Sequence, residues 1–235
     1  MNSLPTNTLS ESSTVAQLAV DYPGALAVFT KYNIDYCCGG HRSIDEACLR
    51  LGLDPEVIKN EIFSSNAGPS QVNFRPELWT SGLLIDYILQ NHHQYIREVT
   101  PELDFLLDKV CDAHGSDTPQ LLQVREVFHQ LADELSDHMV KEEQVLFPAL
   151  KRIERRVDGE HPLQDVVQGP ITAMEHEHFA AGELLKALRS LTNNYTAPEY
   201  ACPTFRITYK TLQEFETDLM QHIHLENNIL FARAK

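Results

Sequence analysis

The sequence lacks several features that define large classes of protein. No apolar run approaches the roughly 20 residues that a membrane-spanning helix needs, so we expect no membrane segment. The first residues show no basic region followed by an apolar stretch, which a secretory signal would contain. Basic residues are also scarce: 19 lysines and arginines stand against 34 acidic residues, for a formal net charge of −15. This balance argues against nucleic-acid binding, which requires a basic face.

Cysteines are few, and their number is odd. The five cysteines fit a reducing compartment better than a disulfide scaffold, so we expect a cytoplasmic protein. Two of them are adjacent, in the segment Tyr36-Cys37-Cys38-Gly39-Gly40. The glycines predict an exposed turn, and a helix predicted to begin at Ser43 would lower the pKa of nearby thiols. We interpret Cys37 and Cys38 as a redox-active or metal-handling pair, with an ordinary turn as the alternative.

Strand patterns are almost absent, and the sequence predicts an all-α protein. Residues 1–75 are typical of a small helical domain that carries the Cys-Cys loop and ends in a polar linker. Residues 76–235 are typical of an antiparallel up-down four-helix bundle. We expect its helices near residues 79–111, 117–150, 170–191 and 204–231, with a loop over 157–169 and a kink or break at Pro101.

Two stretches of the bundle repeat the same pattern of metal-ligand residues. His138 precedes Glu142 by four residues, and His222 precedes Glu226 by four, so each pair occupies one helix face. An imidazole beside a carboxylate makes half of a site for iron, zinc or manganese. The other two predicted helices also carry histidines: His92, His93, His176 and His178. The conjunction predicts a dinuclear metal site in the bundle core.

The donor types indicate which metal is expected. A mixed set of imidazoles and carboxylates favours non-haem iron, with manganese or zinc as alternatives, and bridging carboxylates suit two metals about 3.5–4 Å apart. Cysteine-rich structural zinc and oxygen-bound magnesium or calcium fit less well. A ferritin-like arrangement remains open, because Glu126 lies three residues before His129 and Glu175 lies three before His178. That arrangement would leave the two His-x-x-x-Glu repeats unexplained.

Longer motifs surround these residues and are similar to those of a known family. They are Tyr36-Cys-Cys-Gly-Gly40, His138-Met-Val-Lys-Glu-Glu-Gln-Val-Leu-Phe-Pro148, Met174-Glu-His-Glu-His178 with Ala181-Gly-Glu-Leu-Leu185, and His222-Ile-His-Leu-Glu-Asn-Asn-Ile-Leu-Phe231. The C-terminal portion resembles a hemerythrin-like domain. Residues 14–231 as a whole resemble the repair-of-iron-centres proteins (RIC, the ScdA/YtfE type).

The resemblance implies a set of site residues. The iron ligands would be His93, His138, Glu142, His178, His222 and Glu226, with both glutamates and an oxo or hydroxo group bridging two iron ions. His92 stays open as an alternative to its neighbour His93. Glu134 and Glu177 would line an access path to the metals, or would be ordinary solvated acids. His176 and His224 would be outer or surface groups.

The resemblance also implies a function. It predicts a di-iron protein that repairs iron–sulfur clusters damaged by nitrosative and oxidative stress, with damaged iron–sulfur proteins as partners. The mechanism would be iron donation, or reduction of nitric oxide at the di-iron centre, which would make the protein a nitric oxide reductase. Cys37 and Cys38 would accept iron, reduce the centre or take up nitric oxide. The alternatives are a hemerythrin-like protein that binds or senses dioxygen or nitric oxide without turnover, and a structural module. A homodimer is compatible with the resemblance.

Overall fold

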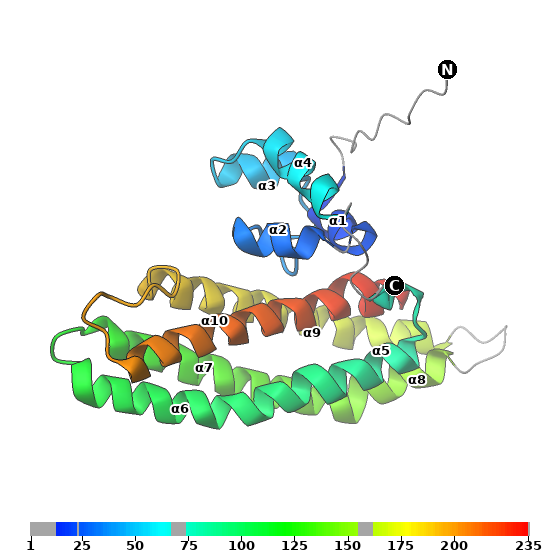
Figure 1. The fold of residues 1–235 in the computed structure, drawn as a ribbon. Helices are drawn as coiled ribbons and strands as arrows, with labels where there is room; N and C mark the ends of the chain where they lie inside the picture. Colours follow the sequence, from blue (N-terminus) through cyan, green and yellow to red (C-terminus); the bar gives the residue numbers. More distant parts are fainter. Residues whose placement is uncertain (1–12, 23, 67–73, 155–161, 235) are drawn as a thin grey trace, which may run out of the picture. The chain divides into compact units, whose positions relative to one another are not determined.

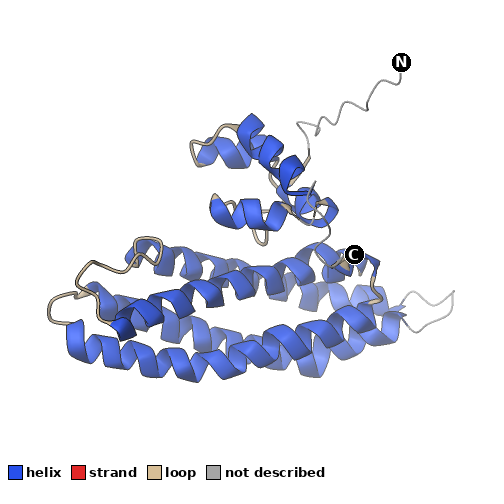
Figure 2. Ribbon diagram, viewed as in Figure 1, coloured by secondary structure: helices blue, strands red, loops and turns tan. Residues whose placement is uncertain are grey.

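The computed structural model describes residues 13–22, 24–66, 74–154 and 162–234 of the chain. The chain divides into two compact units, Met1–Leu78 and Trp79–Lys235. The described residues are helices and loops, and the one strand-type pairing among them is an isolated bridge between Thr14 and Ser43 (Figure 2). The predicted all-α class is confirmed. None of the described helices combines the length and apolar character that crossing a membrane requires.

The first unit consists of short helices around a small core. They are α1 (Val15–Asp21), α2 (Ala25–Lys31), α3 (Ile44–Arg50) and α4 (Pro55–Asn66), followed by the turn η1 (Pro76–Leu78). Ser43 caps α3 as predicted, since its hydroxyl accepts a hydrogen bond from the Glu46 N–H at 3.2 Å. Helices of this length are marginal alone and depend on shared packing. Phe29, Ile44 and Ile62, none of them exposed, supply that packing.

The second unit is a bundle of four long antiparallel helices, which lie across the view in Figure 1 and alternate in direction. The first long helix consists of α5 (Ser81–Tyr87), η2 (Ile88–His93) and α6 (Gln94–His114), and the second of α7 (Gln120–Lys141), η3 (Glu142–Leu146) and α8 (Phe147–Glu154). The third is α9 (Pro162–Leu191). The fourth consists of α10 (Pro203–His224), η4 (Leu225–Leu230) and η5 (Phe231–Arg233). Along each helix the buried apolar residues recur every three or four positions. The core of the bundle therefore runs along its axis, and it is there that the polar ligand candidates lie.

Two prolines lie inside helices of the bundle. The chain stays helical through Pro101, which lies inside α6, so the helix is not broken there, and the alternative of a kink stays a prediction. Helix α9 begins at Pro162 and contains Pro170, so residues 162–169 are helical where a loop was expected; residues 157–161 lie outside the described part. Val167 and Ile171, which are both buried, flank Pro170 in the core. Their packing outweighs the one backbone hydrogen bond that proline removes.

Candidate metal centre

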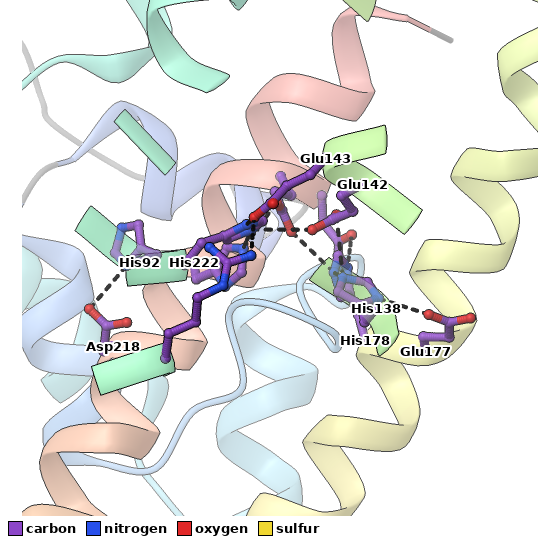
Figure 3. A network of polar contacts seen from close by, with 12 residues as sticks. His92, His138, Glu142, Glu143, Glu177, His178, Asp218 and His222 are labelled. Carbon is purple, nitrogen blue, oxygen red and sulfur yellow. Dashed lines mark hydrogen bonds and ion pairs between the residues drawn. The ribbon is translucent and has the colours of Figure 1, made fainter. Parts of the chain in front are cut away.

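Six polar side chains from all four bundle helices converge in the core (Figure 3). None is more than 3% exposed. Burying several ionisable groups together is costly unless they are paired or coordinate metal. The group comprises His93 from η2, His138 from α7, Glu142 from η3, His178 from α9, His222 from α10 and Glu226 from η4.

The four imidazoles form two pairs. The Nε2 atoms of His93 and His222 lie 3.2 Å apart, and we call this pair the first half-site. The Nε2 atoms of His138 and His178 lie 3.0 Å apart, and they form the second half-site. In each half-site the two nitrogens point toward one another, as two ligands of a shared cation do.

Both carboxylates span the two half-sites. Glu142 places Oε2 at 3.3 Å from Nε2 of His93 and Oε1 at 3.3 Å from Nε2 of His138. Glu226 does the same, with Oε1 at 3.0 Å from His222 and Oε2 at 3.1 Å from His178. Each half-site therefore has two imidazole nitrogens and two carboxylate oxygens, all within 4.8 Å of one another.

The hydrogen bonding of these carboxylates fits a metal. Both oxygens of Glu142 and Oε2 of Glu226 are buried without a well-aligned hydrogen-bond donor. An unsatisfied buried carboxylate oxygen is expensive, and a cation between carboxylate and imidazole would remove that cost. A mixed nitrogen and oxygen set suits transition metals, whereas magnesium and calcium prefer oxygen alone. The buried histidine and glutamate clusters therefore suit a transition-metal site, with iron among the fitting ions.

Outer hydrogen bonds fix two of the imidazoles through carboxylates. His93 Nδ1 lies 2.7 Å from Glu143, and His138 Nδ1 lies 2.8 Å from Glu177. Each of these glutamates also pairs with a cation at 2.6 Å, Glu143 with Arg97 and Glu177 with Lys141. Metal-bound histidines typically donate their second ring N–H to such a group, which sets ring orientation and tautomer.

The third outer partner is an amide. His178 Nδ1 lies 2.8 Å from Oδ1 of Asn227. Sequence reasoning missed both Glu143 and Asn227, although the two residues share a signal. Each directly follows one of the spanning glutamates, so the repeat extends one residue beyond His-x-x-x-Glu.

The electrostatics of the cluster differ from one histidine to the next. Burial lowers the pKa of His138, but the charges of Glu142, Glu226 and Glu177 outweigh it and raise the pKa to about 9. For His222 burial dominates, and its pKa lies below the ordinary value. Although burial raises the pKa of Glu226, His222 and His178 hold it well below its usual range. A carboxylate that stays charged is available to a cation.

Three of the four bundle helices change to π-helical geometry where they reach the centre. The segments are Ile88–His93, Glu142–Leu146 and Leu225–Leu230, and they contain His93, Glu142 and Glu226. π-Helical turns are rare and are frequently found at functional sites, where the added residue changes which side chains face inward. Sequence periodicity gave no sign of them.

The structure separates the remaining histidine candidates. His92 points away from the cluster to Asp218, with 3.0 Å between His92 Nδ1 and Asp218 Oδ1 (Figure 3). His176 is exposed, and His224 is buried, where Asn228 lies 2.8 Å from its Nδ1. The ferritin-like alternative fails because His129 is 47% exposed beside Asp104, outside the core.

A cavity of about 320 Å³ adjoins the second half-site. Glu134 and Glu177, the predicted access residues, both line it together with His138 and His178. Their contacts differ. Glu177 bonds the ring of His138, whereas Glu134 is exposed and accepts a hydrogen bond from Gln130 at 2.9 Å. The cavity lining also includes Leu135, Asp137, Lys141, Ala180 and Ala181.

The cysteine pair in the first unit forms a separate cluster. The Sγ atoms of Cys37 and Cys38 lie 3.5 Å apart. Oδ1 of Asp35 accepts hydrogen bonds from the Cys38 and Gly39 N–H groups at 3.0 Å and from Cys37 Sγ at 3.4 Å. A Cβ at Gly40 would lie 2.8 Å from Tyr36 O, so this turn needs a glycine there. The carboxylate oxygen and both sulfur atoms lie within 4.8 Å of one another, close enough to bind one metal ion together.

The expected low thiol pKa is wrong for Cys37. Its side chain is buried, at 5% exposed, rather than on an open turn. The contact with Cys38, burial and the charge of Asp35 raise its pKa well above the ordinary value. Cys37 is therefore a protonated thiol at neutral pH, and Cys38 is the more accessible member of the pair.

The chain is similar to known proteins over most of its length. The family model for the hemerythrin HHE cation-binding domain matches residues 84–234, and a model described as a domain of unknown function (DUF542) matches residues 11–65. The iron–sulfur cluster repair protein YtfE of Shigella boydii serotype 4 is 40% identical over 220 residues, covering 94% of this chain and 95% of that protein. The protein of the same name from Escherichia coli O8 is 39% identical with the same coverage.

Proposed function

The chain belongs to the hemerythrin-domain family of iron–sulfur cluster repair proteins, and from that premise we propose that it repairs damaged iron–sulfur clusters with a di-iron centre. In this proposal His93 and His222 would hold one iron in the first half-site, and His138 and His178 would hold the other in the second. Glu142 and Glu226 would be shared between the two irons, together with an oxo or hydroxo group.

The single observation that carries the proposal is the way each carboxylate divides its oxygens. One oxygen of Glu142 and one of Glu226 face each pair of imidazoles, at 3.0–3.3 Å from Nε2. One metal ion would leave the other pair of nitrogens and two buried oxygens without a partner. Two ions about 3.5–4 Å apart would use all eight donor atoms.

The first mechanism is iron donation, with Fe(II) as the cargo. Thiolates are the ligands that iron–sulfur clusters select, so Fe(II) held by histidine and carboxylate donors could pass to a thiolate-rich client site. Cys37 and Cys38, with Asp35 beside them, supply a second group of donors that suits iron in transit. The protein loaded with Fe(II) should restore a cluster protein stripped of iron faster than the same amount of free Fe(II). Equal rates would contradict donation.

The cysteine pair can be tested separately. We expect Cys37→Ser combined with Cys38→Ser to keep the iron content of the bundle and to slow cluster repair. Cys202→Ser is a matched control, because Cys202 is also a partly exposed free thiol but lies in the second unit. Repair that proceeds at the wild-type rate without Cys37 and Cys38 would exclude them from the mechanism.

The second mechanism is reduction of nitric oxide, which the cavity beside His138 and His178 favours. Two ferrous ions would supply the two electrons that, with two protons, convert two NO molecules into N₂O and water. The cavity is large enough for two diatomic molecules, and Glu134 and Glu177, which line it, would relay protons in this mechanism. Gas chromatography of the reduced protein after exposure to NO tests this directly. If no N₂O forms when NO is in several-fold molar excess over the reduced protein, the reductase mechanism is contradicted. The donation mechanism is not affected by that result.

A further inference from the structure

One of the four candidate ligand histidines lacks an outer hydrogen bond. The Nδ1 atoms of His93, His138 and His178 each have a partner, as described above. His222 Nδ1 is buried and has none. Without such a bond an imidazole can rotate about its side-chain torsions, so another contact must hold this ring if His222 is to aim Nε2 at the first half-site.

That contact is His92. Its ring lies parallel to the ring of His222, with 5.5 Å between centroids and 6° between planes. This is an offset stack, which restrains a ring against tilting across its flat face. Both rings are almost fully buried, at 2% and 1% exposure, so water does not compete for the face.

His92 is itself held from two further directions. Its Nδ1 lies 3.0 Å from Oδ1 of Asp218, which precedes His222 by one turn of α10. The ring of Tyr87 meets His92 at 5.6 Å and 72°, an edge-to-face contact. Asp218 and His222 therefore approach His92 from the same helix, one through a hydrogen bond and the other through its ring face.

We propose that His92 is a positioning residue that fixes the ring of His222 by stacking, in place of the outer hydrogen bond that the other three ligand histidines have. The inference rests on the proposed di-iron centre and adds an element to it. His92 binds no metal in this scheme. Its role is to keep the first half-site in the geometry that a cation requires.

The test separates ring stacking from other effects of His92. Leucine at this position fills the space without a flat ring, whereas phenylalanine keeps the ring and removes the hydrogen bond to Asp218. We expect His92→Leu to weaken the binding of one of two Fe(II) ions about tenfold or more, the usual effect of losing an outer partner of a ligand. His92→Phe should stay much closer to wild type. Anaerobic competition with a coloured Fe(II) chelator gives both constants.

Spectroscopy and a matched variant guard against a general loss of structure. When both proteins are loaded with Co(II), the visible spectrum of His92→Leu should differ from that of the wild type in the bands of one cobalt ion. The bands of the other should be unchanged, because only the first half-site is disturbed. His224→Leu is the control, since His224 is another histidine at 2% exposure on the helix of His222, with its Nδ1 beside Asn228. It should bind Fe(II) as the wild type does. The thermal midpoint of the metal-free proteins shows whether either leucine variant is merely unstable.

Two results would overturn the proposal. Wild-type Fe(II) affinity in a folded His92→Leu variant would show that the stack does not position His222. Equal weakening by leucine and phenylalanine would assign the effect to the hydrogen bond with Asp218 and not to the ring face. A wild-type protein that fails to bind two Fe(II) ions would instead contradict the proposed di-iron function, so the two failures are distinguishable.

Discussion

The two half-sites of the candidate centre have the same inner donors and different surroundings. Each combines two imidazole nitrogens with one oxygen from each of Glu142 and Glu226. Around the second half-site, Glu177 and Asn227 hold the rings by hydrogen bonds, and a cavity adjoins the imidazoles. Around the first, one ring has a hydrogen bond to Glu143 and the other has a stacked neighbour, His92.

This difference separates two tasks that a metal centre must perform. The matched inner donors determine which ions fit and how two of them share charge. The unmatched outer groups determine where a small molecule approaches and how firmly each ring is fixed. On this account the second half-site, which adjoins the cavity, is the one that faces incoming ligand.

Removing a shared carboxylate should affect both half-sites. Glu226 contributes one oxygen to each, so we expect Glu226→Ala to retain less than about one iron per chain. Elemental analysis after gel filtration measures this. Glu134→Ala should keep the wild-type content, because Glu134 lines the cavity and accepts its hydrogen bond from Gln130, not from an imidazole. Full iron content in Glu226→Ala would refute a shared carboxylate.

Removing one imidazole should affect one half-site. We expect His138→Ala to retain about one iron, in the first half-site, and His222→Ala to retain about one, in the second. In each variant the other pair of rings remains intact. Mössbauer spectra of the two variants should then differ, since the retained irons have different surroundings. Two irons in either variant would show that the substituted histidine is not a ligand.

Removing an outer partner should weaken the metal without removing it. Glu177 bonds His138 at 2.8 Å, so Glu177→Ala should lower Fe(II) affinity at the second half-site about tenfold. Chelator competition measures the change, and Glu134→Ala again serves as the control on the same cavity wall. Equal affinities for the two variants would mean that the outer bond has no influence on the metal.

Filling the cavity should slow access and leave metal content unchanged. Ala181 is 3% exposed and lines the cavity, so Ala181→Leu places a larger side chain beside the second half-site. We expect stopped-flow binding of NO to the reduced protein to slow several-fold. Ala187→Leu, further along α9 and outside the lining, is the matched control. An unchanged rate for Ala181→Leu would argue that ligands enter by another route.

The sequence predicted the parts of the site that depend on local geometry. His138 with Glu142 and His222 with Glu226 could be recognised because four residues on a helix bring two side chains to one face. The four-helix class followed from periodic apolar residues. The assignment of His93 and His178 came from family resemblance, because spacing alone does not distinguish His93 from His92.

The parts that sequence reasoning missed depend on contacts between helices. Asn227 and Glu143 matter because a ring on a neighbouring helix reaches them, and the bonds span 49 and 50 residues of sequence. The π-helical turns also depend on the packed bundle, because they turn the candidate ligands toward its core. The sequence predicts Pro170 as the first residue of a helix, and only packing in the bundle shows that it lies inside one. The burial of Cys37 likewise depends on how a short loop folds onto its own unit.

The most direct test of the central claim is the metal content per chain of the wild type and of the double variant Glu142→Ala with Glu226→Ala. Elemental analysis of anaerobically purified protein should give about two irons for the wild type and a near-complete loss for the double variant, because the four spanning oxygens are gone. The metal-free double variant should remain helical by circular dichroism. One zinc, a single iron, or full iron retention in the double variant would contradict a pair of irons shared by these two glutamates.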